Sequence, residues 1–329
     1  MKKIAINGFG RIGRASLKVI MDTPGLEIAA VNDLLTIENA AYLLKYDSVY
    51  GIYPKEVTAN GDHLQVGDKK IRYLSIKKPA ELPWKELEID TVIESTGIFT
   101  NREDAEKHLH AGAKHVVISG PTKSVDTPTI VHGVNTEDGK VAIFSCASCT
   151  TNNISPLIEI LGRRIGIKKA ILNTTHAYTA SQSLVDGPSK KKPRMGRAAA
   201  MNLVPASTGA AIATIKTLPQ YEGKFDGIAI RTPVVVGSIS DITFVAERAT
   251  SAEEINQILK EEAATDRYKK VVSFSDQPLV STDIIQSTFA ATVDSEMTRV
   301  VDGDLCKVMA WYDNEWGFTN QMIRQVQEI

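Results

Sequence analysis

The first third of the chain alternates between short apolar runs and amphipathic segments. Residues 2–7 and 26–32 are largely apolar and too short for helices, which predicts two buried strands. Between them, the apolar positions from Ala15 to Ile20 favour a helix. This order of strand, helix and strand is typical of the repeating unit of a parallel sheet.

The same alternation continues as far as residue 148. Residues 42–78 suggest an insertion of short strands around turns. Further strands are expected at 91–95, 115–119, 129–134 and 141–145, with a helix at 103–111. We therefore expect an α/β domain with a Rossmann-type, doubly wound, mostly parallel sheet.

Beyond residue 149 the pattern changes towards longer strands in which apolar and polar residues alternate. Residues 227–236 and 239–247 predict antiparallel strands joined through Gly237 and Ser238. The remaining expected elements are a helix from near Thr150, a strand at 168–173, an alanine-rich helix opened by residues 205–211, a helix capped by Ser251 and Glu254, a strand at 306–312 and a last helix ending at Ile329. The second domain is expected to be α+β with a mainly antiparallel sheet.

Composition and charge agree with an ordinary globular protein. The chain has 329 residues, enough for two cores, and a formal net charge of −1, so no overall field attracts nucleic acid or an anionic membrane. We expect no signal peptide and no membrane-spanning segment. Three cysteines in such a chain favour a cytoplasmic protein with free thiols.

The turn after the first strand predicts a dinucleotide site. Gly8, Gly10 and Gly13 form a G-x-G-x-x-G motif between strand and helix, and Asp33 follows the second strand. The glycines let the backbone approach a pyrophosphate, and Asp33 can accept hydrogen bonds from ribose hydroxyls, which favours NAD over NADP. Arg11 and Arg14, however, are also able to reach a phosphate, which weakens this preference.

Cys149 lies where an apolar strand leads into a helix. Backbone N–H groups and the helix dipole stabilise an anion there, which suits a nucleophilic thiolate. Two other interpretations stay open: a buried apolar cysteine, or a redox or metal pair with Cys146 in a C-x-x-C motif. No second ligand pair accompanies that motif in the sequence, so we expect no metal.

Other polar residues stand where strands are expected to end. Thr96, Gly97 and Ser119 follow strands of the parallel sheet and are expected to face the same crevice as Cys149. His176 lies far enough beyond Cys149 for a returning strand to bring the two together as a base and a nucleophile.

Six segments together resemble phosphorylating glyceraldehyde-3-phosphate dehydrogenase over essentially the whole chain. They are Ile-Asn-Gly-Phe-Gly-Arg-Ile-Gly-Arg (6–14), Val-Asn-Asp-Leu (31–34), Ala-Ser-Cys-Thr-Thr-Asn (147–152), His-Ala-Tyr-Thr (176–179), Ser-Thr-Gly-Ala-Ala (207–211) and Trp-Tyr-Asp-Asn-Glu (311–315). The resemblance implies a glycolytic enzyme that is a homotetramer, with an NAD-binding domain at 1–148, a catalytic domain at 149–314 and a C-terminal helix at 315–329 that packs on the first domain.

The resemblance also implies roles for individual residues. Cys149 is expected to be the nucleophile and His176 its partner, acting on D-glyceraldehyde 3-phosphate and inorganic phosphate. The residues expected to contact NAD are Arg11, Ile12, Asp33, Lys77, Ser119 and Asn314. Thr179 and Arg231 are expected to bind the phosphate of the substrate, and Ser148, Thr150, Thr208 and Gly209 the attacking phosphate. The basic loop at 186–197 resembles a loop that lies near a neighbouring subunit's cofactor.

The chain departs from the family at a few positions. The family commonly has Asn where this chain has Cys146 and Cys where it has Asn153, so a Cys146–Cys149 disulfide is one open hypothesis. Two alternative functions also stay open: an erythrose-4-phosphate dehydrogenase on the same scaffold, and a non-catalytic, redox-sensing nucleotide-binding protein.

Overall fold

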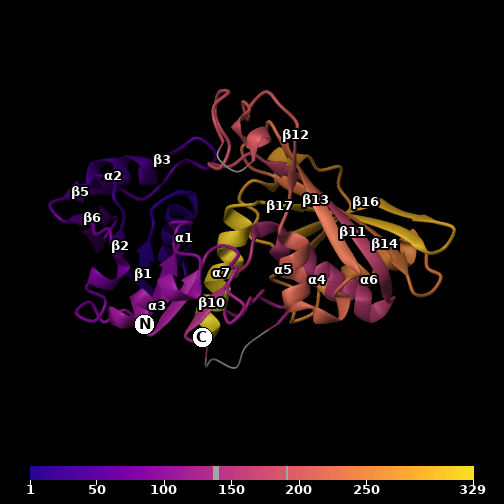
Figure 1. Ribbon diagram of the computed structural model, residues 1–329, viewed down its shortest axis with the longest axis horizontal. Helices are drawn as coiled ribbons and strands as arrows, with labels where there is room; N and C mark the ends of the chain where they lie inside the picture. Colours follow the sequence, from indigo (N-terminus) through magenta and orange to yellow (C-terminus); the bar gives the residue numbers. More distant parts are fainter. Residues whose placement is uncertain (136–140, 190–191) are drawn as a thin grey trace. The chain divides into compact units, whose positions relative to one another are not determined.

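The computed structural model describes residues 1–135, 141–189 and 192–329, and Lys190 and Lys191 of the basic loop lie outside the described residues. These residues form two compact units (Figure 1). The first comprises Met1–Ile130, 141–147 and Met322–Ile329, and the second comprises Val131–Asn135 and the described part of Ser148–Gln321.

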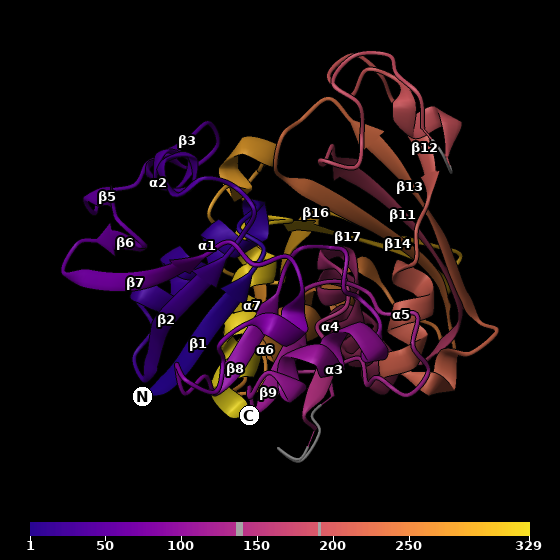
Figure 2. The same ribbon diagram turned by 60° about the vertical axis from the view of Figure 1, so that its left-hand side comes forward.

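The first unit is built on an eight-stranded sheet with the order β10-β9-β8-β1-β2-β7-β6-β5. The strands are β1 (Lys2–Asn7), β2 (Leu26–Asn32), β5 (Val57–Asn60), β6 (His63–Val66), β7 (Lys69–Leu74), β8 (Thr91–Glu94), β9 (His115–Ile118) and β10 (Ile143–Ser145). The strands from β10 to β7 are parallel, and β5 and β6 extend the sheet as an antiparallel hairpin. Figure 2 shows β1, β2 and β7 side by side.

The order of strands around β1 creates the place for a ligand. Strand β1 leads through the glycine-rich turn into α1 (Arg11–Met21) and pairs with β2 on one side and β8 on the other. The chain therefore leaves β1 towards β2 and later crosses to β8, and a crevice is expected beyond the carboxyl ends of these three strands. Helices α2 (Ile37–Lys45) and α3 (Arg102–His110) and the small β3–β4 pair (Tyr46–Asp47 and Gly51–Ile52) complete this part.

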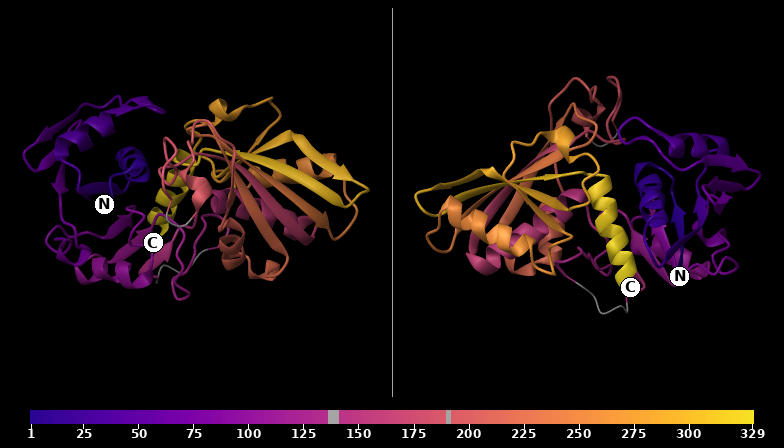
Figure 3. Two further views of the ribbon diagram at one scale, coloured as in Figure 1. Left: turned by 45° about the horizontal axis from the view of Figure 1, so that its top comes forward. Right: turned by 180° about the vertical axis from the view of Figure 1, so that it is seen from behind.

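The second unit contains a seven-stranded, mainly antiparallel sheet with the order β12-β13-β11-β14-β17-β16-β15. Its strands are β11 (Ile167–Ala177), β12 (Val204–Ser207), β13 (Phe225–Thr232), β14 (Ser238–Ala246), β15 (Val272–Ser275), β16 (Ala291–Val301) and β17 (Leu305–Tyr312). Among the described strands of this second sheet, only β11–β13 and β15–β16 are parallel pairs. Figure 3 shows this sheet from two further sides, with β16 and β17 running side by side.

Helices cover one face of this second sheet (Figure 1). They are α4 (Cys149–Arg164), α5 (Ala210–Thr217) and α6 (Ala252–Ala263). Leu157 and Leu161 of α4 pack with Leu172, Ile242 and other fully buried residues of the strands. Because strand side chains alternate between faces, Leu172 is buried in this core while its neighbour Ile171 is 58% exposed. The last helix, α7 (Trp316–Glu328), contributes residues to both units.

The predicted fold class, a Rossmann-type α/β part with an α+β part, is confirmed, but one expected strand is wrong. Residues 129–134 are not a strand: Thr129 makes one bridge to Ser145, and the chain then turns with Gly133 at a φ of +78°. Strands β13 and β14 are antiparallel, as predicted, and β11 lies between them. This insertion places His176 directly opposite Arg231 of β13.

Candidate active site

Cys149 is the first residue of α4, as the strand-to-helix pattern predicted. Ser148 caps this helix: its hydroxyl accepts a hydrogen bond from Thr151 N at 3.1 Å. Ala147, just before the cap, has a φ of +58°, a strained conformation for a residue with a side chain. The turn therefore fixes Cys149 at the positive end of the helix dipole, which stabilises a thiolate once the proton has left.

Strand β11 brings His176 to Cys149. The Cys149 Sγ and His176 Nε2 atoms are 3.4 Å apart, and His176 is only 5% exposed. Its other nitrogen, Nδ1, lies 2.6 Å from the carbonyl oxygen of Ala177 and 3.0 Å from Arg231 Nη1. A single ring nitrogen cannot donate to the carbonyl and accept from the guanidinium at once.

We assign the proton to Nδ1, for two reasons. The contact with Ala177 O is the shorter one, and Arg231 Nη1 already donates to the same oxygen at 3.0 Å. With a proton on Nδ1, the lone pair of Nε2 faces the sulfur of Cys149, so His176 is oriented as a base towards the thiol.

Burial acts against charge on both members of the pair. Burial, together with a smaller effect of the Arg231 charge, lowers the pKa of His176 to about 4. Desolvation raises the pKa of the Cys149 thiol, while Arg231 and hydrogen bonds from Thr150 act in the opposite direction. In the resting site these directions favour a neutral thiol beside a neutral imidazole. Proton transfer between them creates opposite charges whose mutual attraction offsets part of the desolvation cost.

Tyr312 and Thr174 support this pair, a role that sequence analysis did not predict for either residue. Tyr312 OH lies 2.9 Å from Thr150 Oγ1 and 2.8 Å from Thr174 Oγ1, and its ring meets the His176 ring edge-on at 6.0 Å. Tyr312 occupies an apolar position in a strand pattern, so periodicity describes it only as a core residue. Its hydroxyl ties β17 to β11 and to the first turn of α4.

Several residues predicted to bind phosphate have an available donor or a helix end. Arg231 Nε is buried and has no hydrogen-bond partner among the described residues, so it can donate to an anion. Thr179 Oγ1 lies 2.8 Å from Ser181 Oγ, and Thr208 and Gly209 precede the first turn of α5. The hydroxyls of Ser148 and Thr150 are already engaged in the α4 cap and with Tyr312. The phosphate roles of these residues stay predictions.

Five of the predicted cofactor residues line one cavity of about 810 Å³ in the first unit: Gly8, Gly10, Asp33, Lys77 and Thr96. Its other walls are largely apolar and include Leu34, Pro79 and Phe99. The carboxylate of Asp33 accepts from Phe9 N at 2.5 Å and from Leu35 N at 3.0 Å, which holds it at the cavity wall. An apolar cavity with a glycine-rich edge and one fixed carboxylate fits an adenosine group.

The other predicted cofactor residues do not line this cavity. Arg11 pairs with Asp47 at 2.6 Å. Gly13 has a packing role, because a Cβ there would lie 2.1 Å from Gly8 O. Ile12 lies in the first turn of α1, Gly97 follows β8 with a φ of +71°, and Ser119 follows β9. Their cofactor contacts stay predictions.

Asn314 belongs to the second unit. Its Oδ1 accepts from Gly237 N at 3.2 Å and from Ser238 Oγ at 3.0 Å. This fixes the orientation of the side chain, and its Nδ2 is left to donate elsewhere. A contact with the nicotinamide carboxamide stays a prediction.

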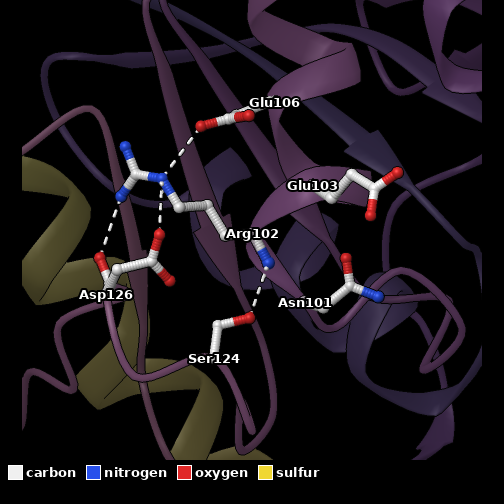
Figure 4. A pocket seen from close by; sticks show the side chains of 6 residues that line it. All are labelled: Asn101, Arg102, Glu103, Glu106, Ser124 and Asp126. Atoms are coloured by element: carbon white, nitrogen blue, oxygen red, sulfur yellow. Dashed lines mark hydrogen bonds and ion pairs between the residues drawn. The ribbon is translucent and has the colours of Figure 1, made fainter.

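A second hollow, of about 320 Å³, lies beside the start of α3 (Figure 4). Arg102 dominates it, but its guanidinium is already matched by Glu106 at 2.8 Å and by the carbonyl of Asp126 at 2.9 Å. The backbone N–H of Arg102 also donates to Ser124 Oγ at 3.0 Å. These contacts connect α3 to the loop at 124–126 and leave the arginine little capacity for a ligand.

No group of three or more His, Cys, Asp and Glu side chains within the described ranges is placed to hold a metal ion. None of the helices in the described part of the chain is long and apolar enough to cross a bilayer. All three cysteines are free thiols.

Comparison with known proteins identifies the family. Residues 2–102 match the family model "Glyceraldehyde 3-phosphate dehydrogenase, NAD binding domain", and residues 148–314 match its C-terminal domain. A glyceraldehyde-3-phosphate dehydrogenase of Zymomonas mobilis is 46% identical over 325 residues, which cover 98% of this chain and 96% of the relative. Proteins of the same name from Thermotoga maritima (46% over 327 residues, 98% and 97%) and Xanthobacter flavus (45% over 324 residues, 97% and 96%) are similar to it.

These matches confirm the resemblance and the prediction of NAD as cofactor, and they do not favour the erythrose-4-phosphate or redox-sensor alternatives. With both family models matched in order and relatives aligned along nearly the whole chain, this protein belongs to the glyceraldehyde 3-phosphate dehydrogenase family of NAD-dependent oxidoreductases.

Proposed function

We propose that the protein oxidises and phosphorylates D-glyceraldehyde 3-phosphate to 1,3-bisphosphoglycerate through a thioester on Cys149. The observation that carries this proposal is the 3.4 Å approach of Cys149 Sγ to His176 Nε2. The family match and the cavity of the first unit support NAD⁺ as the oxidant.

The first step is covalent capture of the aldehyde. His176 Nε2 takes the thiol proton, and the sulfur of Cys149 adds to the aldehyde carbon to form a tetrahedral alkoxide. The Nε2–H of His176 then stabilises this oxygen, because it is the donor next to the sulfur. We propose that Arg231 binds the phosphate of the substrate beside the same histidine, because its Nε has no hydrogen-bond partner among the described residues.

Oxidation and release follow on the same sulfur. NAD⁺ would supply the hydride acceptor when bound, and loss of the hydride would convert the tetrahedral carbon into the carbonyl of a thioester on Cys149. Inorganic phosphate attacks the thioester carbonyl, and the bond to sulfur breaks to release the acyl phosphate and the Cys149 thiolate. His176 retains the proton that it returns to the thiolate or gives up to solvent. Ser148, Thr150, Thr208 and Gly209 are proposed to bind the attacking phosphate.

We also propose that the chain acts as a homotetramer in a reducing cytoplasm. Exposed apolar side chains on the second sheet and its connections support an assembly, including Ile171, Met201, Leu203 and Ile228, each more than half exposed. The three free thiols support a reducing compartment.

The test is NADH formation by the purified protein from D-glyceraldehyde 3-phosphate, NAD⁺ and inorganic phosphate. We expect turnover that requires all three and a higher kcat/KM for this aldehyde than for erythrose 4-phosphate. Failure to form NADH would overturn the proposal, and a higher kcat/KM for erythrose 4-phosphate would favour the alternative substrate.

A further inference from the structure

A buried carboxylate stands beneath the cofactor cavity and has no part in the mechanism above. Glu94 ends strand β8, and its side chain is fully buried. Its Oε1 accepts from Thr96 N at 2.9 Å and also from Thr96 Oγ1. Its Oε2 accepts from Asn7 Nδ2 at 2.5 Å and lies 3.1 Å from His108 Nε2. A buried acceptor with this many donors indicates a built arrangement and not an incidental one.

The direction of the hydrogen bonds on one side of Glu94 is fixed by backbone groups. Ile76 N donates to Asn32 Oδ1 at 2.9 Å, and Asn32 Nδ2 donates to Ile76 O at 2.9 Å, so the Asn32 amide cannot be reversed. Its Nδ2 therefore also donates to Asn7 Oδ1, at 2.7 Å. It follows that Asn7 must turn its own amide nitrogen towards Glu94.

The direction on the other side is fixed by an indole. Trp84 Nε1 can only donate, and it lies 2.9 Å from His108 Nδ1. Nδ1 must accept, which leaves the hydrogen of the neutral ring on Nε2, facing Glu94. Trp84 and His108 are both fully buried, so water does not replace either contact.

On both sides the hydrogen-bond chain thus ends in a donor that faces Glu94: Asn7 Nδ2 on one side and His108 Nε2 on the other. Among residues of this size, only a carboxylate offers acceptors to Asn7, His108 and Thr96 together. A glutamine would have to place its NH2 group against at least one N–H.

This hydrogen-bond chain forms the floor of the cofactor cavity. Asn7, Asn32 and Thr96 all line that cavity. Gly8 lies against Thr96 so closely that a Cβ on Gly8 would be 2.5 Å from Thr96 N. Ser95 Oγ donates to Gly8 O at 2.7 Å. A shift of the Glu94 side chain would therefore move Thr96 and with it the glycine turn.

We propose that Glu94, His108 and Trp84 are positioning residues for the dinucleotide: their one-directional hydrogen-bond chain holds Asn7, Gly8 and Thr96 in the conformation that binds NAD⁺. The inference rests on the proposed NAD cavity of the first unit.

The first test is Glu94→Gln, which has nearly the same shape and the wrong hydrogen-bond polarity. We expect the Kd for NAD⁺, measured by titration calorimetry, to rise about tenfold or more, which corresponds to about 1.4 kcal/mol. The matched control is Asp90→Asn at the opposite end of β8, where Asp90 accepts from Lys3 N at 2.9 Å and Lys114 Nζ at 2.5 Å. This control is expected to stay within about twofold of the wild-type Kd.

The second test compares two replacements of His108. In His108→Gln the side-chain oxygen can accept from Trp84 and the nitrogen can donate to Glu94, so the polarity is kept and NAD⁺ binding should stay near wild type. His108→Leu removes both functions and should weaken binding as Glu94→Gln does. For Glu94→Gln and His108→Leu, kcat at saturating NAD⁺ should be unchanged while KM for NAD⁺ rises, because the reacting pair belongs to the second unit. For His108→Gln, both kcat and KM for NAD⁺ should stay near wild type.

Two results would overturn the inference: wild-type affinity in Glu94→Gln, or equal Kd values for the Gln and Leu variants of His108. If Glu94→Gln does not fold, the His108 pair decides. Failure of the wild-type protein to bind NAD⁺ is a distinct result, since it would overturn the proposed cavity itself.

Discussion

His176 takes its orientation from the carbonyl of its own neighbour in β11. Ala177 O holds Nδ1–H at 2.6 Å, and the same oxygen accepts from Arg231. A neutral carbonyl orients the ring without adding a negative charge that would favour the imidazolium. The resting pair is therefore neutral, and the thiolate is formed when the proton moves to Nε2.

His176→Asn is expected to raise the pKa of Cys149. Without the imidazole, the thiol must lose its proton to solvent, and the buried thiolate has no cation at 3.4 Å. A raised pKa means that thiolate appears only at higher pH, so the midpoint of iodoacetamide alkylation should move upwards by about one unit or more. The exposed His110→Asn serves as a control. Superimposable alkylation profiles for wild type and His176→Asn would refute the role of the base.

At the scale of elements, the sequence predicted the features that depend on neighbouring residues, such as the ends of strands and the caps of helices. Strands β1 and β2 have the predicted bounds because apolar runs end at turn residues, and α4 begins at Cys149 because Ser148 caps it. The order of strands was less accessible. The insertion of β11 between β13 and β14 depends on pairing between residues far apart in sequence, and this pairing brings Arg231 to His176.

Sequence analysis also missed residues whose role depends on contacts between distant parts of the chain. Asn7 and Asn32 are polar residues at the ends of buried strands, a signal that was present in the sequence. Glu94 is likewise a charged residue at the end of the buried strand β8, so the same signal was present for it. His108 lies in α3 and gave no such signal, because its role depends on its contacts with Trp84 and Glu94. Helix α2 and strand β16 were not predicted either.

Helix α6 offers a prediction at this scale. Ser251 Oγ accepts from Glu254 N at 3.2 Å, which is the cap expected from the sequence. Ser251→Ala should lower the free energy of unfolding by about 1 kcal/mol, because an N–H of the first turn loses its acceptor. Ser251→Asp keeps an acceptor and should remain near wild type in urea denaturation, and kcat should be unchanged in both. Equal stability of the Ala and Asp variants would contradict this assignment.

At the scale of the whole molecule, the two units carry different parts of the chemistry. The first holds the cavity edged by Gly8 and Gly10, and the second holds Cys149, His176 and Arg231. With a formal net charge of −1, the protein has no overall field for anionic ligands, so each phosphate must be bound by local donors. Because NAD⁺ binding and the chemistry at Cys149 are assigned to different units, a substitution in one unit should change one of these functions and leave the other unchanged.

Two variants test this separation. Gly10→Ala has open space around the new methyl group, since a Cβ there meets nothing within 4 Å, so the fold should be kept. The methyl group would occupy the place where the backbone approaches the pyrophosphate, and the Kd for NAD⁺ should rise at least about tenfold. The rate of Cys149 alkylation without NAD⁺ should not change.

Cys149→Ser should show the reverse: wild-type NAD⁺ affinity with nearly all NADH formation lost, because a serine hydroxyl is a far weaker nucleophile at neutral pH. If Gly10→Ala slowed alkylation, or Cys149→Ser retained turnover, the division of roles between the two units would be wrong.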